Sequence, residues 1–132
     1  MDILIDTNIV ISAALFPNNR MTRFLAVISE ENSLFLCSYS LEEIQRVVKR
    51  KFPTKTRDME AFLQDLQYTL VGTPSTNVLD GIALRDLNDY PILASAFIAD
   101  VDILITGDRD FGGVHIERPE ILTISEFMKK YA

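Results

Sequence analysis

Cysteine and histidine are almost absent from this sequence, and their scarcity excludes several kinds of protein. The one cysteine, Cys37, cannot form an internal disulfide, and this composition suits a reducing cytosol. The one histidine, His115, lies in a Gly-Gly-Val-His-Ile stretch that is typical of a loop or an edge strand. A Ser-His-Asp triad would depend on His115, and Cys37 has no histidine candidate nearby to activate it as a nucleophile. We therefore expect Cys37 to belong to the core and His115 to be a structural or surface residue.

Long apolar runs are also missing. No run approaches the length of a membrane span, and the N-terminus has neither the basic region nor the longer apolar stretch of a signal peptide. We expect a cytoplasmic protein that makes no membrane contact. Its 132 residues fit one domain, 1–132, which is large enough to bury a core without disulfides or a structural metal.

Positive charge is scarce as well. The chain has 13 lysines and arginines against 19 acids, and its net charge of −6 disfavours whole-surface binding to nucleic acid. Residues 44–57 are an exception, because they include no acid and contain the cations Arg46, Lys49, Arg50 and Lys51, followed by Lys55 and Arg57. This segment is either a solvated helix end and loop or a local anion-binding surface. Its first four cations are our candidates for contact with nucleic acid.

Short apolar runs alternate with amphipathic segments along the chain. We expect buried strands at Ile3–Ile5, Leu34–Cys37 and Ile103–Ile105, and a short last strand at Ile121–Ile124. We expect helices at Thr7–Leu15, Thr22–Glu30 and Thr56–Leu70, and a terminal helix from a Ser125 cap through Lys130. This order predicts an α/β domain, a three-layer sandwich with a central, mainly parallel β-sheet flanked by helices.

Two further helix starts contain acids. Ser40 is followed three residues later by Glu43, which is the capping-box pattern, and Pro53 would stop this helix. Asp89 precedes Tyr90-Pro91, where aspartate suits the N-cap and proline suits the first turn. Each acid could therefore serve only its own helix.

Acids also stand directly after two of the predicted strands. Asp6 follows the first strand, and Asp108 follows the strand at Ile103–Ile105. Ligands of open parallel sheets bind beyond the carboxyl ends of the strands, so we expect both carboxylates at one edge, with Glu43 and Asp89 as further candidates. Carboxylates gathered there would raise one another's pKa, and a divalent cation would remove that cost. Oxygen-only ligands suit Mg²⁺ or Mn²⁺ rather than zinc.

These acids differ in how well a structural role explains them. Asp6 is the hardest to explain, because an ionisable group that abuts an apolar run is costly without a partner. Asp108 could serve a glycine-containing turn. Glu42 is an alternative to Glu43 as the glutamate of the site. Helical phase favours Glu43, which lies four positions before Val47 on the apolar side of the helix.

A series of motifs resembles PIN domains in order and spacing. These motifs are Asp6-Thr7-Asn8-Ile9-Val10 after a strand, Leu41-Glu42-Glu43-Ile44, Asp89 before Pro91-Ile92-Leu93-Ala94, and Thr106-Gly107-Asp108-Arg109-Asp110-Phe111. The resemblance extends from Asp2 to about Phe127. It is greatest to the VapC-like ribonucleases, which are toxins of type II toxin–antitoxin pairs.

The resemblance implies a site and an activity. The catalytic residues, which would hold one or two Mg²⁺ or Mn²⁺ ions, are Asp6, Glu43, Asp89 and Asp108. Asp110 becomes an accessory acid, and Asn8 and Thr106 become polar supports of the site. The implied activity is metal-assisted hydrolysis of phosphodiester bonds in RNA, which needs no histidine base. The implied partners are an RNA substrate and an antitoxin that presents arginine to the acids, and apolar helix faces leave a homodimer open.

Other classes fit less well. A haloacid-dehalogenase-type phosphatase needs a second aspartate where Asn8 stands, and a response-regulator receiver needs a lysine where Thr106-Gly107-Asp108 stands. No P-loop or dinucleotide-binding glycine motif is present. The remaining alternative is a non-catalytic RNA-binding or scaffold module with the PIN fold. The complete set of acids argues against that alternative, because an inert module has little use for acids that repel one another.

Overall fold

The structure, a computed structural model, describes residues 1–75, 90–107 and 116–132. Its centre is a five-stranded sheet in the order β3-β2-β1-β4-β5, in which every neighbouring pair is parallel. The strands are β1 Asp2–Ile5, β2 Ser33–Cys37, β3 Thr69–Val71, β4 Ile103–Ile105 and β5 Glu120–Leu122. The predicted α/β sandwich with a parallel central sheet is confirmed.

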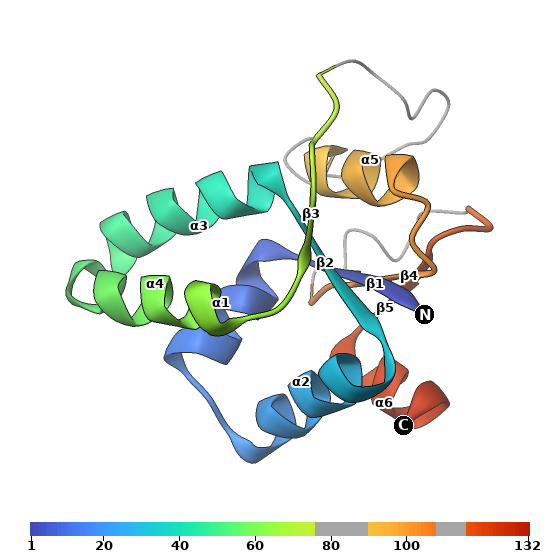
Figure 1. The fold of residues 1–132 in the computed structure, drawn as a ribbon, viewed down its shortest axis with the longest axis horizontal. Coiled ribbons are helices and arrows are strands. Elements are labelled where there is room, and N and C mark those ends of the chain that lie inside the picture. The colour runs from blue at the N-terminus through green and yellow to red at the C-terminus, as the bar shows by residue number, and fades with distance from the viewer. Residues whose placement is uncertain (76–89, 108–115) are drawn as a thin grey trace.

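Helices cover both faces of this sheet (Figure 1). They are α1 Thr7–Leu15, α2 Asn19–Glu31, α3 Ser38–Lys51, α4 Thr56–Asp65, α5 Tyr90–Ile98 and α6 Ile124–Tyr131, with a short 3-10 turn, η1, at Pro53–Lys55. The helix α5 packs on one face, and α2 and α6 pack on the opposite face. None of the helices within the described ranges is long and apolar enough to cross a membrane.

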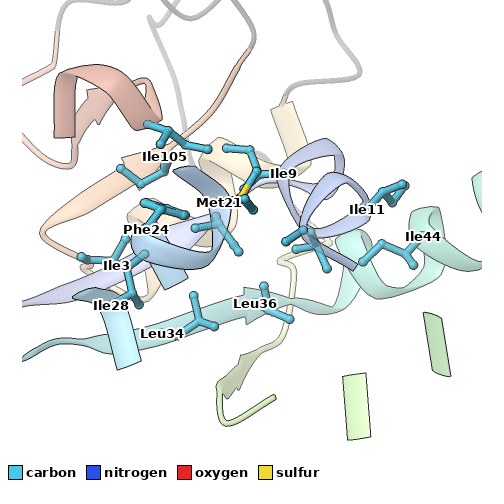
Figure 2. Packing of buried hydrophobic residues seen from close by; sticks show 14 of the residues in the cluster. Ile3, Ile9, Ile11, Met21, Phe24, Ile28, Leu34, Leu36, Ile44 and Ile105 are labelled. Atoms are coloured by element: carbon cyan, nitrogen blue, oxygen red, sulfur yellow. The ribbon is translucent and has the colours of Figure 1, made fainter. Parts of the chain in front are cut away.

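The two cores follow from the alternation of side chains along β1. Ile3 and Ile5 point to the face covered by α1, α2, α3, α4 and α6, whereas Leu4 points to the face covered by α5. All three side chains are buried, which explains why a parallel strand has a continuous apolar run. Figure 2 shows Ile3 and Ile105 of the sheet packed against Phe24 and its neighbours in α2.

The helix α2 starts three residues earlier than predicted. Asn18 is its N-cap, and the side chain of Asn18 accepts a hydrogen bond from the backbone N–H of Met21 at 2.8 Å. An asparagine cap satisfies one of the unpaired N–H groups at a helix start, which places the start before Thr22. The buried residues Met21, Phe24 and Ile28 then form the inner face.

The capping box predicted at Ser40 and Glu43 is wrong. The helix α3 already begins at Ser38, so Ser40 is a buried residue of its first turn. The Ser40 hydroxyl accepts hydrogen bonds from Thr7 Oγ1 at 3.1 Å and from Cys37 Sγ at 3.3 Å. Ser40 therefore joins α3 to α1 rather than capping a helix.

The structure places a capping box at α6 instead. Thr123 is the N-cap there, and its side chain and that of Glu126 each bond to the other residue's backbone N–H. The Ser125 cap predicted for this helix is therefore wrong by two residues.

The helix predicted for 56–70 is too long. The helix α4 ends at Asp65, and Thr69–Val71 forms the edge strand β3, which pairs with β2. In β3 the side chain of Val71 is buried, whereas that of Leu70 is 56% exposed. Pairing with β2 overrides the helical spacing of the apolar residues in this segment, and β-branched Thr69 and Val71 suit a strand.

Candidate functional site

The order of the strands places a crevice at the end of β1. From β1 the chain proceeds to β2 and β3 on one side, and the later strands β4 and β5 lie on the other side. Ligands of such sheets bind where the strand order reverses, beyond the carboxyl ends of the strands. Asp6 follows β1 at this point, and its backbone N–H donates to the carbonyl of Ile105, the last residue of β4, at 3.1 Å.

The Asp6 carboxylate is buried, with only 5% of the residue exposed. One of its oxygens, Oδ1, accepts a hydrogen bond from the backbone N–H of Ile9 at 3.1 Å, so Asp6 is the N-cap of α1. The other, Oδ2, accepts from Thr106 Oγ1 at 2.5 Å. The start of α1 also carries partial positive charge, which stabilises the carboxylate. Two neighbouring segments therefore fix the orientation of Asp6.

A cavity of about 310 Å³ opens beside Asp6. It is lined by Asp6, Asn8, Ile9, Ser12, Met21, Gly107 and Ile124. Asn8 is exposed, so its amide is accessible from solvent. Gly107 brings the chain after β4 to the wall of the cavity. Asp6 is thus a buried carboxylate at the wall of an open pocket at the carboxyl edge of the sheet.

Glu43 lies on α3, one turn after Ser40, and is half-buried. Its Oε2 accepts a hydrogen bond from the hydroxyl of Tyr39 at 3.2 Å, and the Arg46 guanidinium lies 5.9 Å from the centre of the Tyr39 ring. Burial and the charge of Glu43 raise the pKa of Tyr39. Glu42 is exposed, in agreement with the helical phase that favoured Glu43.

A buried hydrogen bond links the segments that contain Asp6 and Glu43. Thr7, the residue after Asp6, donates from Oγ1 to Ser40 Oγ at 3.1 Å. The first turns of α1 and α3 therefore lie together at the carboxyl edge of the sheet. Glu43 does not line the cavity beside Asp6, so the structure places these two acids on adjoining helices without placing them in one pocket.

The remaining predicted acids, Asp89, Asp108 and Asp110, lie outside the described residues, as does His115. Their neighbours in sequence are described: Tyr90 is the first residue of α5, and Gly107 lines the cavity. Among residues 1–75, 90–107 and 116–132, no three or more histidine, cysteine, aspartate or glutamate side chains gather as a metal site. The acidic quartet therefore stays a prediction.

A second polar network at this edge was not predicted from the sequence. Thr73, just beyond β3, donates its backbone N–H to Ser38 Oγ at 2.9 Å. Its own Oγ1 accepts from the backbone N–H of Tyr39 at 3.0 Å and from Ser95 Oγ at 2.9 Å. This network joins the end of β3, the start of α3 and the middle of α5. No spacing pattern marks it, because its members come from distant segments.

The predicted nucleic-acid-binding cations separate into two groups along α3. Arg46 lies near Tyr39 on the turn that contains Glu43, whereas Lys49, Arg50 and Lys51 are in the last turn. Cations in a last turn complement the partial negative charge at a helix C-terminus, which gives these three residues a structural role. Their contact with nucleic acid stays a prediction.

Comparison with known proteins agrees with this geometry. The pattern that defines the PIN domain matches residues 2–110, so the chain belongs to the PIN domain family. A comparison with curated proteins finds no match.

Among solved structures, the fold is similar to that of a chain in the crystal structure of VapBC2 from Rickettsia felis bound to a DNA fragment from their promoter. The TM-score is 0.72 at 18% sequence identity, over 92% of this chain and 97% of the other. At this identity, the likeness establishes a shared fold.

Proposed function

We propose that this PIN domain is a divalent-metal-dependent endoribonuclease. The observation that carries the proposal is Asp6, a buried carboxylate held by two hydrogen bonds at the wall of a cavity where the strand order reverses. Burying a carboxylate is costly, and a purely structural cap needs no open pocket beside it. A cation-binding role explains both features.

The donors at this edge suit Mg²⁺ or Mn²⁺. Asp6 and Glu43 offer carboxylate oxygens, whereas buried Cys37 donates to Ser40 and is therefore engaged elsewhere. Hard divalent cations prefer such oxygen ligands. In the proposal Asp89 and Asp108 complete the ligand set for one or two ions, with Asp110 as an accessory acid. Bound there, the cation would supply Lewis-acid chemistry for phosphodiester hydrolysis.

The other residues of the site would orient its parts. Thr106 and the N–H of Ile9 fix the direction of the Asp6 carboxylate. Tyr39 holds Glu43 through its hydroxyl, and Asn8, which lines the cavity, would support the site through hydrogen bonds of its amide. No step in this scheme requires a histidine.

We further propose that the protein acts in the cytoplasm as the toxin of a toxin–antitoxin pair. Support comes from its membership of the PIN domain family and from the fold that it shares with a chain of the VapBC2 complex. In this proposal a protein antitoxin inserts arginine among the acids, where guanidinium–carboxylate pairs are strong. A homodimer is the proposed assembly, and a solution mass near that of one chain would contradict it.

RNA cleavage tests the proposed activity. Single-stranded RNA should be cut in the presence of Mg²⁺ or Mn²⁺, and EDTA should stop the reaction. Asp6→Asn should lower the rate by more than about 100-fold, since even partners outside the first metal shell contribute 10–100-fold. Asparagine caps a helix as well as aspartate does, so this variant should still fold.

The outcomes separate the two functions considered. Cleavage that survives Asp6→Asn would remove Asp6 from the mechanism and contradict the proposal. RNA that binds but is never cut, whatever the metal, would favour the non-catalytic module. Circular dichroism of Asp6→Asn provides the folding control.

A further inference from the structure

A groove between α2 and α6 lies beside the Asp6 cavity and is lined by cations. Its volume is about 380 Å³, and its lining residues are Arg20, Arg23, Ser125, Met128 and Lys129. No acid is among them. The groove is therefore a positively charged surface on a chain whose net charge is −6.

The groove adjoins the cavity through neighbouring residues. Arg20 precedes Met21, and Ser125 follows Ile124, while Met21 and Ile124 line the cavity beside Asp6. The two helices lie on the same side of the sheet (Figure 1). They are held together by the rings of Phe24 and Phe127, whose centres are 5.9 Å apart. The groove therefore lies between two helices that pack against each other, and residues next to its lining residues in the sequence line the cavity.

The groove cations form no ion pair within the described part of the chain. Ion pairs there join Arg118 to Asp100 and Asp102, and Lys130 to Glu120, but none involves the groove cations. Glu126 is the acid of α6, and its carboxylate accepts a hydrogen bond from the backbone N–H of Thr123 at 3.0 Å.

The two arginines are placed to act together. Arg20 and Arg23 are exposed and stand three residues apart on α2, so they project from the same face of the helix. Arg20 is also in the first turn, where the partial charges of the helix favour an anion. Guanidinium groups bind phosphate through paired hydrogen bonds.

We infer that this groove binds the phosphate backbone of single-stranded RNA and leads the strand into the Asp6 cavity. The inference rests on the proposed ribonuclease function and deepens it by assigning a substrate-binding surface. An acidic protein repels RNA at long range, so it needs a local cationic path to the site. The cations touch the strand away from the bond that is cut, so they contribute to binding rather than to the chemical step.

The test compares two double variants that remove equal charge. Arg20→Gln/Arg23→Gln alters the groove, whereas Arg118→Gln/Lys130→Gln alters cations that are paired with acids and line neither the groove nor the cavity. With Asp6→Asn in both to prevent cleavage, binding of a labelled single-stranded RNA is followed by anisotropy from about 50 to about 200 mM salt. Losing two phosphate contacts should reduce the salt slope by roughly 1.4 and weaken binding about 10-fold at low salt, and the control should keep its slope.

A charge-preserving variant and a kinetic assay complete the test. Arg20→Lys/Arg23→Lys should keep most of the salt slope. On the cleavage-competent background, Arg20→Gln/Arg23→Gln should raise KM and leave kcat unchanged. Equal loss of affinity in the groove and control variants would overturn the inference while the ribonuclease function stands, as would a fall in kcat alone. A parent protein that neither binds nor cuts RNA would overturn both.

Discussion

Asp6 has a structural task and a proposed chemical task. As the N-cap it satisfies a backbone N–H of α1, and through Oδ2 it holds Thr106 beside β4. The same two contacts fix the orientation of the carboxylate. A substitution that removes the carboxylate altogether would mix both effects, which is why asparagine rather than alanine is the informative replacement.

Glu43 and Glu42 form a natural pair of test and control. They are adjacent on α3, but Glu43 is half-buried and accepts from Tyr39, whereas Glu42 is exposed. We expect Glu43→Gln to lower the cleavage rate by more than about 100-fold, because a metal ligand should matter more than partners in the outer shell, which contribute 10–100-fold. Glu42→Gln should change the rate by less than about threefold, because an exposed substitution usually changes the stability by no more than about 0.5 kcal/mol. The rate constants at saturating Mg²⁺ measure both. Equal effects from the two variants would contradict the role proposed for Glu43.

The site could be predicted in part at the residue scale. The sequence identified Asp6 because an acid directly after an apolar run needs an explanation, and the structure places it at a cavity as a buried carboxylate. The role of Thr73 could not be predicted, because its partners Ser38, Tyr39 and Ser95 are distant in sequence. The structure does not describe Asp89 and Asp108, so their place in the site rests on the sequence alone.

Among the strands and helices, the sequence predicted those that a local pattern of residues specifies. Continuous apolar runs identified β1, β2 and β4, because strands that are buried on both faces consist largely of apolar residues. The edge strand β3 was missed, since its pairing with β2 is a tertiary interaction. Helix starts were less accurate: Ser40 has the right residue type for a cap, but in the folded protein its hydroxyl bonds to Thr7 instead.

The contact between α6 and β5 should depend on pH. Glu120 of β5 pairs with Lys130 and accepts from the Tyr131 hydroxyl at 2.6 Å. The hydrogen bond from Lys130, helped by that from Tyr131, lowers the pKa of Glu120 below its usual 4.5. A lowered folded-state pKa contributes stability that is present above about pH 4.5 and is lost as the pH falls through the folded value.

Urea unfolding at neutral and acid pH measures this contribution. Glu120→Gln should be less stable than the parent at neutral pH, and the difference should shrink below the folded-state pKa of Glu120. The difference should be small and weaker in high salt, since the pair is largely exposed. A difference that is constant with pH would show that charge is not its cause. Glu117→Gln is a suitable control, because Glu117 is exposed and takes no part in this contact.

The whole molecule carries a net charge of −6, and the proposed site crowds several acids at one edge of the sheet. Both are unfavourable in the folded protein without a bound cation, because like charges repel more strongly when they are brought together. A cation that binds only the folded state therefore stabilises it by RT ln(1 + c/Kd), where c is the cation concentration, and this gain increases with the logarithm of its affinity. Metal binding and folding stability should be linked in this protein.

Thermal unfolding measures that link without relying on catalysis. At a Mg²⁺ concentration ten times its dissociation constant, the folded state should gain about 1.4 kcal/mol, which corresponds to a rise in Tm of roughly 5 °C for a chain of this size. Asp6→Asn should remove most of the rise, because a ligand is lost, whereas Glu42→Gln should keep it. The same ionic strength supplied as NaCl controls for general screening. If Tm rises equally in all three proteins, Mg²⁺ acts on the surface as a whole and Asp6 is not a metal ligand; an Asp6-dependent rise would establish the metal site even before an RNA substrate is found.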